Sequence, residues 1–144
     1  MDNDLTAAVH AEVPWLGQPT RFTDPLGSEA GMPESVTLYW EIRQPERVAV
    51  NITYKVSGSP EETSGLLKSM AFTTSVPGSV AEGVGDEARW LGPTRPDPAS
   101  RRTVALRIGR VVVRIGAPGG WIDRIVARIL PLVRAQEAEL SRQQ

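Results

Sequence analysis

The sequence predicts an α+β domain in which an antiparallel sheet of about five strands carries helices on one face. Two observations support this class. Five segments alternate apolar and polar residues with a period of two, and their spacing along the chain is that of local hairpins. Two longer segments carry apolar residues at helical spacing, so that each has an apolar side to lay on the sheet. We assign the domain to residues 36–136, between an N-terminal arm (1–35) and a fraying tail (137–144).

The arm is predicted to hold one short helix. Apolar residues at helical spacing indicate a helix over Leu5–Val13, with Asn3 or Asp4 as its cap. Residues 17–35 are rich in Gly, Pro and Ser and show no periodicity. They are therefore predicted to be an irregular surface segment.

A hairpin and a helix open the domain. Residues 36–42 and 48–56 alternate apolar with polar side chains and are separated by a short turn, which predicts two paired strands. A helix over 60–72 follows. Ser59 stands at its N-cap and Glu62 three positions later, which is the pattern of a capping box.

The clearest pattern is a second hairpin, with strands at 103–108 and 111–115 and a two-residue turn at Gly109-Arg110. Glycine at the first central position is what a type II′ turn requires. A further strand is predicted just upstream, at Ala88–Leu91. With the hairpin turn at Gly109-Arg110, six apolar residues of the two hairpin strands share one face. They are Val104, Leu106, Ile108, Val111, Val113 and Ile115.

The longest helix is predicted over Trp121–Gln136, with an apolar stripe that includes Ile122 and Ile129. Proline inside a helix removes a backbone donor and clashes with the preceding turn. We therefore expect a kink or a break near Leu130, ahead of Pro131.

The amino-acid composition excludes several kinds of site and cross-link. The 144 residues include no cysteine and one histidine, so disulfides, thiolate metal sites and cysteine nucleophiles are excluded. No apolar run is long enough to span a membrane, and the N-terminus is acidic. We expect a cytoplasmic location if Met1 is the native start, and a cell-envelope or extracellular one if a longer precursor has been trimmed.

Charge is divided unevenly along the chain. Residues 1–88 hold 5 basic and 13 acidic side chains, whereas residues 89–144 hold 11 basic and 4 acidic ones. We assign a candidate interaction surface to the basic part, for an acidic face or a partner protein, with a solvated sheet face as the plainer alternative. Single-strand nucleic-acid binders interleave cations with aromatic residues, a pattern that is missing here, so no specific nucleic-acid binding is expected. The residues of this candidate surface are Trp90, Arg95, Arg101, Arg102, Arg107 and Arg114.

The sequence offers few candidates for catalytic or metal-binding residues. Asp86 is interpreted as the cap of a turn after Gly85, and Glu87 as solvated or paired with an arginine. His10 is interpreted as a surface residue. The glycines before residue 121 fit a strand-to-helix turn better than a phosphate loop, because neither phosphate-binding motif is present. No catalytic residue, metal or cofactor is therefore predicted.

Four tryptophans are many for this length: Trp15, Trp40, Trp90 and Trp121. Core packing is the first explanation for them. If two of them prove to be exposed together, a ligand pocket or a protein interface becomes the better interpretation.

Part of the chain resembles small domains of actinobacterial cell-envelope lipoproteins and receptor-type ectodomains, most of unknown function. The resemblance covers roughly residues 36–135. It rests on the run Val76-Pro77-Gly78, the corner Gly83-Val84-Gly85-Asp86-Glu87-Ala88-Arg89-Trp90, the glycine-turned hairpin and the closing helix. It implies an antiparallel-sheet α+β fold, which has been likened in some of these domains to the photosystem subunit PsbP, and a cell-envelope location. The chain lacks the lipobox cysteine and signal segment of that pattern, and the resemblance brings no catalytic residues.

These observations favour a non-enzymatic binding or protein-interaction module. The alternative is a small-ligand or lipid carrier with a pocket between the sheet and the C-terminal helix. An enclosed apolar pocket above roughly 300 Å³, the low end for ligand sites, would favour the carrier.

Overall fold

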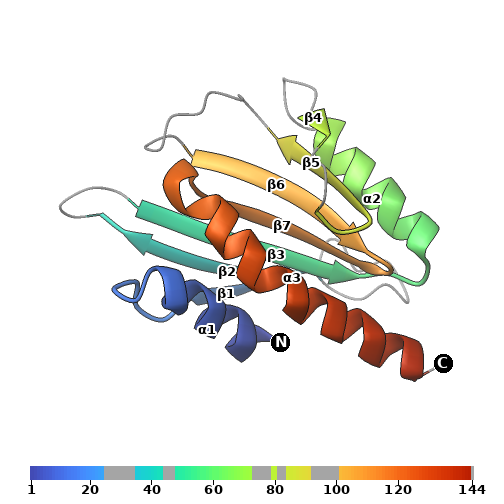
Figure 1. Ribbon diagram of the computed structural model, residues 1–144, viewed down its shortest axis with the longest axis horizontal. Coiled ribbons are helices and arrows are strands. Elements are labelled where there is room, and N and C mark those ends of the chain that lie inside the picture. Colours follow the sequence, from blue (N-terminus) through green and yellow to red (C-terminus); the bar gives the residue numbers. More distant parts are fainter. Residues whose placement is uncertain (25–34, 44–47, 73–78, 81–83, 92–100, 144) are drawn as a thin grey trace.

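The computed structural model describes residues 1–24, 35–43, 48–72, 79–80, 84–91 and 101–143. These residues form three helices and a seven-stranded antiparallel sheet with the order β1-β2-β3-β7-β6-β5-β4 (Figure 1). The predicted α+β class is confirmed, with two more strands than the five expected. The elements are α1 (Asp2–Glu12), β1 (Thr20–Asp24), β2 (Ser35–Ile42), β3 (Val48–Val56), α2 (Pro60–Phe72), β4 (Ser79–Val80), β5 (Glu87–Leu91), β6 (Arg101–Ile108), β7 (Val111–Pro118) and α3 (Gly119–Arg142).

The β6–β7 hairpin has the predicted register. Leu106 faces Val113, and Ile108 faces Val111 across the turn. Gly109 has φ of +56°, and no residue other than glycine has a positive φ among those described. This agrees with a type II′ turn, which needs a left-handed conformation only at its first central position.

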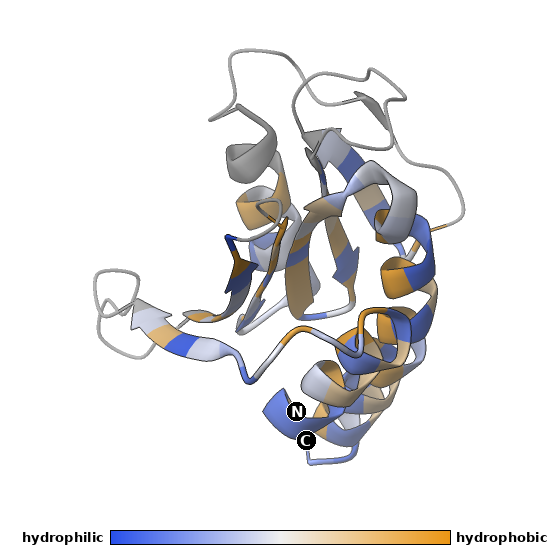
Figure 2. Cartoon of the chain, turned by 90° about the vertical axis from the view of Figure 1, so that its left-hand side faces the viewer, coloured by the Kyte–Doolittle hydropathy of each residue, from blue (hydrophilic) through white to orange (hydrophobic). Residues whose placement is uncertain are grey.

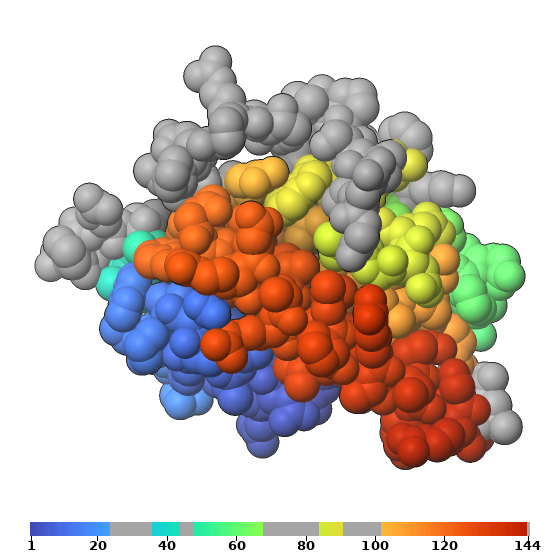
Figure 3. Space-filling model, viewed as in Figure 1, coloured from blue at the N-terminus to red at the C-terminus, as the bar shows by residue number. Residues whose placement is uncertain are grey.

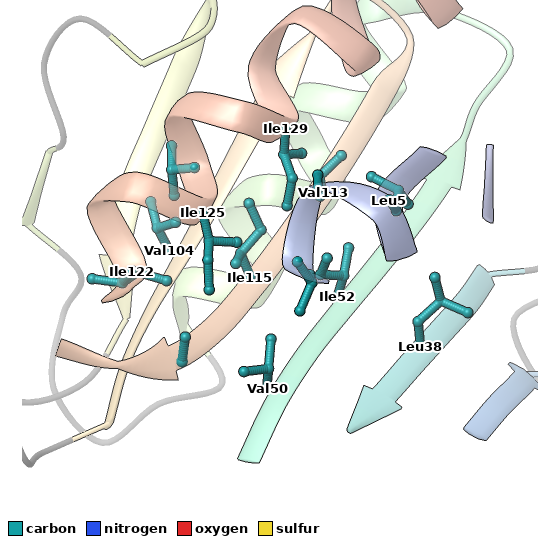
Figure 4. Close-up of a cluster of buried hydrophobic side chains, with 14 of the residues drawn as sticks. Leu5, Leu38, Val50, Ile52, Val104, Val113, Ile115, Ile122, Ile125 and Ile129 are labelled. Carbon is teal, nitrogen blue, oxygen red and sulfur yellow. The ribbon is translucent and has the colours of Figure 1, made fainter. Parts of the chain in front are cut away.

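The main core lies between this hairpin and α3 (Figure 4). The apolar stripe of α3 is buried, and it packs on the apolar face of β6 and β7. The side chains involved are Ile122, Ile125, Ile129 and Val133 of α3 with Val104, Leu106, Val113 and Ile115 of the hairpin. The prediction that Leu106, Val113 and Ile129 are buried together is confirmed.

The helices do not all lie on one face of the sheet, which corrects the predicted arrangement. Figure 2 shows α1 and α3 on one side and α2 on the other. Leu67 of α2 packs on Ala105 and Val112, which belong to the opposite face of the β6–β7 hairpin. That face combines two arginines with two apolar residues, and the apolar pair is enough to dock a helix.

Residues 1–24 belong to the domain and are not a separate arm. Leu5 and Val9 of α1 are buried in the same core as α3, and β1 pairs with β2. The irregular segment predicted for 17–35 therefore contains a strand at its start; residues 25–34 lie outside the described part. Periodicity missed β1 because this five-residue strand has one neighbour and a largely exposed surface.

The predicted N-cap of α2 is present, and the reciprocal bond of the capping box is shifted by one residue. The backbone N–H of Glu62 donates to Ser59 Oγ at 3.2 Å. The Glu62 carboxylate accepts a bond from the backbone N–H of Gly58, one residue before the cap, at 3.1 Å. Two donors at the helix start are thereby satisfied.

The last helix is longer than predicted and is not broken at Pro131. It runs continuously from Gly119 to Arg142, with Pro131 exposed on its outer side. Ile129 and Val133 are buried on either side of the proline, so packing holds both halves against the core. The predicted fraying from residue 137 is also absent, because Glu137 accepts a bond from the backbone N–H of Arg110 at 2.9 Å.

Candidate functional site

The described side chains of the predicted arginine surface lie on two different faces of the sheet. Trp90 and Arg102 belong to the face that carries α3, where the Arg102 guanidinium carbon lies 4.0 Å from the centre of the Trp90 ring. Arg107 and Arg114 point to the opposite face. The reason is strand parity, since successive residues of a strand alternate between faces. Arg95 lies outside the described residues, as does the side chain of Arg101, whose backbone begins β6.

The acidic pair Asp86-Glu87 is bound into the hairpin. An oxygen of Asp86 accepts a bond from the backbone N–H of Gly109 at 2.8 Å, and Glu87 accepts one from Arg107 Nε at 3.0 Å. Gly85 has φ of +64°, and a Cβ there would lie 2.8 Å from the Arg107 carbonyl oxygen. The interpretation of Glu87 as an ion-pair partner of an arginine is confirmed. Asp86 caps a turn as well, but it is the β6–β7 turn at Gly109 and not the predicted turn after Gly85. The described residues contain no group of three or more metal-ligating side chains.

His10 joins the end of α1 to the turn that follows it. Its Nε2 lies 2.8 Å from the carbonyl oxygen of Gly17. Because a carbonyl only accepts, this nitrogen carries the proton. Together with the buried helix around it, this contact shows that His10 is a partly buried structural residue and not part of a loose arm.

The first residue of α1 is fixed to two strands. Asp2 accepts bonds from Arg21 Nε of β1, at 2.6 Å, and from the Tyr54 hydroxyl of β3. Burial, followed by the bond to Asp2, raises the pKa of Tyr54 to about 12. Burial alone would raise the pKa of Asp2, but the bonds from Tyr54 and Arg21 and the charge of Arg21 together lower it. The network holds α1 at the edge of the sheet.

Two tryptophans from opposite ends of the chain meet at the surface. Trp15 follows α1 and Trp121 lies in the first turn of α3. Their ring centres are 5.7 Å apart, with an angle of 66° between the planes, an edge-to-face arrangement. Trp15 is 50% exposed and Trp121 partly so. Trp121 also packs against the main core, so among the four tryptophans only Trp15 is exposed, and the condition of two exposed tryptophans is met in part.

Charged side chains flank this pair. Glu12 accepts a bond from Arg128 Nε at 2.7 Å and lies 3.5 Å from Arg124 Nε. One carboxylate thus faces two arginines, and one positive charge is left uncompensated within this group. We call Trp15, Trp121, Glu12, Arg124 and Arg128 the tryptophan surface. In Figure 3 its two helices, α1 and α3, lie side by side on the face shown.

An open groove of about 390 Å³ continues along the seam between α1 and α3. It is lined by Asp4, Ala7, Ala8, Ala11, Arg128 and Leu132. Arg128 therefore belongs both to the groove and to the tryptophan surface. The alanines on α1 make the groove, since a short side chain leaves space between the two helices.

The tryptophan surface lies at the same end of the molecule as the Trp90–Arg102 pair. Arg102 of β6 is paired with Ala117 of β7, two residues before α3 begins at Gly119. Sequence reasoning identified the tryptophans as candidates but could not pair Trp15 with Trp121. For Arg124 and Arg128 on α3, the one feature of the sequence that links them is their spacing of four residues on the helix.

Comparisons with protein-family models, with curated proteins and with solved structures found no match to this chain. In the described residues no helix is both long enough and apolar enough to cross a membrane.

Proposed function

We propose that this domain is a non-enzymatic protein-interaction module whose contact surface centres on Trp15 and Trp121. The observation that carries the proposal is the exposed Trp15 ring, which is held edge-to-face by the partly buried Trp121 where the end of α1 meets the start of α3. A large apolar side chain that is ordered before binding loses little conformational freedom when a partner covers it. Tryptophan is among the residues that contribute most to interface energies.

The surroundings of the pair indicate the chemistry of the partner. Arginines are enriched in interfaces along with aromatic residues, and Arg124 and Arg128 carry one more charge than Glu12 neutralises. Residues 89–144 as a whole carry seven more basic than acidic side chains. The partner that fits is a protein with an apolar contact surrounded by carboxylates.

The packing of α3 argues against the carrier alternative. A carrier with its pocket between sheet and C-terminal helix needs a cavity there, and fully buried isoleucines of α3 fill that space against the hairpin. The groove between α1 and α3 is open to solvent and is lined by two charged residues, Asp4 and Arg128. Ligand sites usually enclose most of an apolar ligand.

The experiment compares two variants that each remove one exposed aromatic side chain. Trp15→Ala removes the centre of the tryptophan surface, and Phe22→Ala removes a side chain that is 54% exposed on β1. Tagged wild type and both variants are incubated with native extract, and captured proteins are identified by mass spectrometry. We expect a protein captured by wild type and Phe22→Ala but lost with Trp15→Ala. Equal capture by all three, with equal melting temperatures, would contradict the proposal.

A further inference from the structure

The C-terminal end of α3 is held to the sheet differently from the rest of the helix. Five side chains between residues 122 and 133 are buried in the main core, whereas none from residue 134 to 142 is buried. Within this last stretch Leu140 is partly buried and packs against the main core. Figure 1 shows this end of α3 and the β6–β7 turn at the same end of the molecule. We call residues 134–142 the strap.

One carboxylate fastens the strap to the β6–β7 turn. Glu137 Oε2 accepts a bond from the backbone N–H of Arg110 at 2.9 Å, and its Oε1 accepts one from the Ser141 hydroxyl at 3.1 Å. The carboxylate lies against Gly109, where a Cβ would be 2.3 Å from Glu137 Cδ. The strap therefore has one polar contact with the turn, through Glu137, and one apolar contact with the core, through Leu140.

The turn itself is fixed by other parts of the chain. The backbone N–H of Gly109 donates to Asp86 at 2.8 Å, and the carbonyl of Arg110 accepts a bond from the backbone N–H of Ser57 at 2.9 Å. Both bonds come from segments outside α3. The turn would therefore keep its place if the strap moved away.

The helix before the strap has one backbone bond fewer than usual. Pro131 has no N–H, so the bond that residue 131 would make to the carbonyl of Ala127 is missing. An interruption of this kind is a common place for a helix to bend. Val133 is the last buried residue of α3, so an opening that begins at the C-terminus stops there.

We propose that the strap is a conformational device that Glu137 holds closed on the β6–β7 turn, and that it opens as one unit while the rest of the fold stays intact. Segments with few buried apolar contacts open with a smaller free energy than core helices do. Opening frees the N–H of Arg110 and uncovers the part of the core under Leu140. The tryptophan surface lies towards the other end of α3, so this inference goes beyond the proposed function and does not depend on it.

Hydrogen exchange in the native state, followed by NMR, tests the device in the wild type. The amide of Arg110 should exchange with the same opening free energy as amides 136–140, because one event exposes both. Amides 125–130 of the same helix should exchange at least about tenfold more slowly. Protection that declines residue by residue towards the C-terminus, with Arg110 not following it, is ordinary end fraying and would overturn the proposal.

Two variants test whether the strap moves as a unit. Leu140 makes no bond to Arg110, so faster exchange of the Arg110 amide in Leu140→Ala reports opening of the strap. We expect a rise of about fivefold from the loss of this partly buried contact. Glu139→Ala, at an exposed position of the strap, is the matched control and should stay within about twofold of wild type. Unchanged exchange at Arg110 in Leu140→Ala, or an equal rise in Glu139→Ala, would contradict the proposal.

Glu137→Ala tests the carboxylate itself. Alanine has a higher helix propensity than glutamate, so faster exchange in this variant cannot come from a weaker helix. Amides 136–140 should exchange about tenfold faster, because a hydrogen bond to a charged group is lost, while amides 125–130 should not change. No change in the strap, or an equal rise in both stretches, would overturn the proposal. Trp15→Ala should leave the exchange of the strap as in wild type, so the strap and the proposed interaction surface can fail independently.

Discussion

At the scale of single residues, the contacts of Asp2 show how charge fixes α1 in place. Asp2 begins the first element of the chain, and its carboxylate accepts bonds from Arg21 of β1 and Tyr54 of β3. No pattern in the sequence indicated this network. Asp2 precedes the predicted helix, and both of its partners come from strands. One of these strands, β1, was not predicted from the sequence pattern.

The pH dependence of stability tests this network. The pKa of Asp2 is lower in the folded protein than its ordinary value of 3.8, so its contribution is present above that value and is lost as pH falls through the folded-state pKa. Asp2→Asn should therefore be less stable than wild type near pH 7, and the difference should shrink towards pH 3. Urea unfolding of both proteins at several pH values measures it. A difference that stays constant with pH would show that the charge of Asp2 plays no part.

A second residue-scale prediction concerns Asp86. Its carboxylate satisfies the backbone N–H of Gly109 in the hairpin turn. Asp86→Ala should cost about 1 kcal/mol, as the loss of a capping side chain does. The exposed Asp123 on α3 gives a control, and Asp123→Ala should stay within about 0.5 kcal/mol of wild type. Equal losses in the two variants, from urea unfolding curves, would rule out the capping role.

At the scale of elements, the main core is formed by the packing of α3 on the β6–β7 hairpin. Leu106 lies under the stripe of α3, and Leu106→Ala should cost ~2–5 kcal/mol through lost transfer energy and the cavity left behind. Thr103→Ala changes the opposite face of the same strand and should cost much less. Chemical denaturation gives both values. A loss below about 0.5 kcal/mol for Leu106→Ala would be incompatible with the register.

The elements that the sequence predicted best are those in which local pattern and tertiary contacts agree. Both hairpins, α2 and the start of α3 have strong periodicity and clear turn or cap residues. Of the kink or break predicted at Pro131, the break is absent, because packing on both sides of the proline outweighs one lost hydrogen bond. The position of α2 could not be predicted either, because Ala105 and Val112 share their face of the hairpin with two arginines, and that pattern indicates a polar face.

At the scale of the whole molecule, candidate sites depend on contacts between distant segments. The predicted arginine surface grouped residues that are close in sequence, and strand parity divides them between two faces. The tryptophan surface joins residues 12–15 to residues 121–128, a contact that no local pattern reveals. The resemblance to actinobacterial cell-envelope domains stays a prediction, because the comparisons found no match that bears on it.

The interaction surface is tested most directly by the affinity of a captured partner for three purified proteins. Titration calorimetry of wild type, Trp15→Ala and Phe22→Ala against that partner gives the dissociation constants. If Trp15 is at the centre of the interface, Trp15→Ala should weaken binding by about 30-fold or more, which is the 2 kcal/mol of an interface hot spot. Phe22→Ala should bind within about twofold of wild type. Wild-type affinity in a folded Trp15→Ala protein would contradict the proposed function.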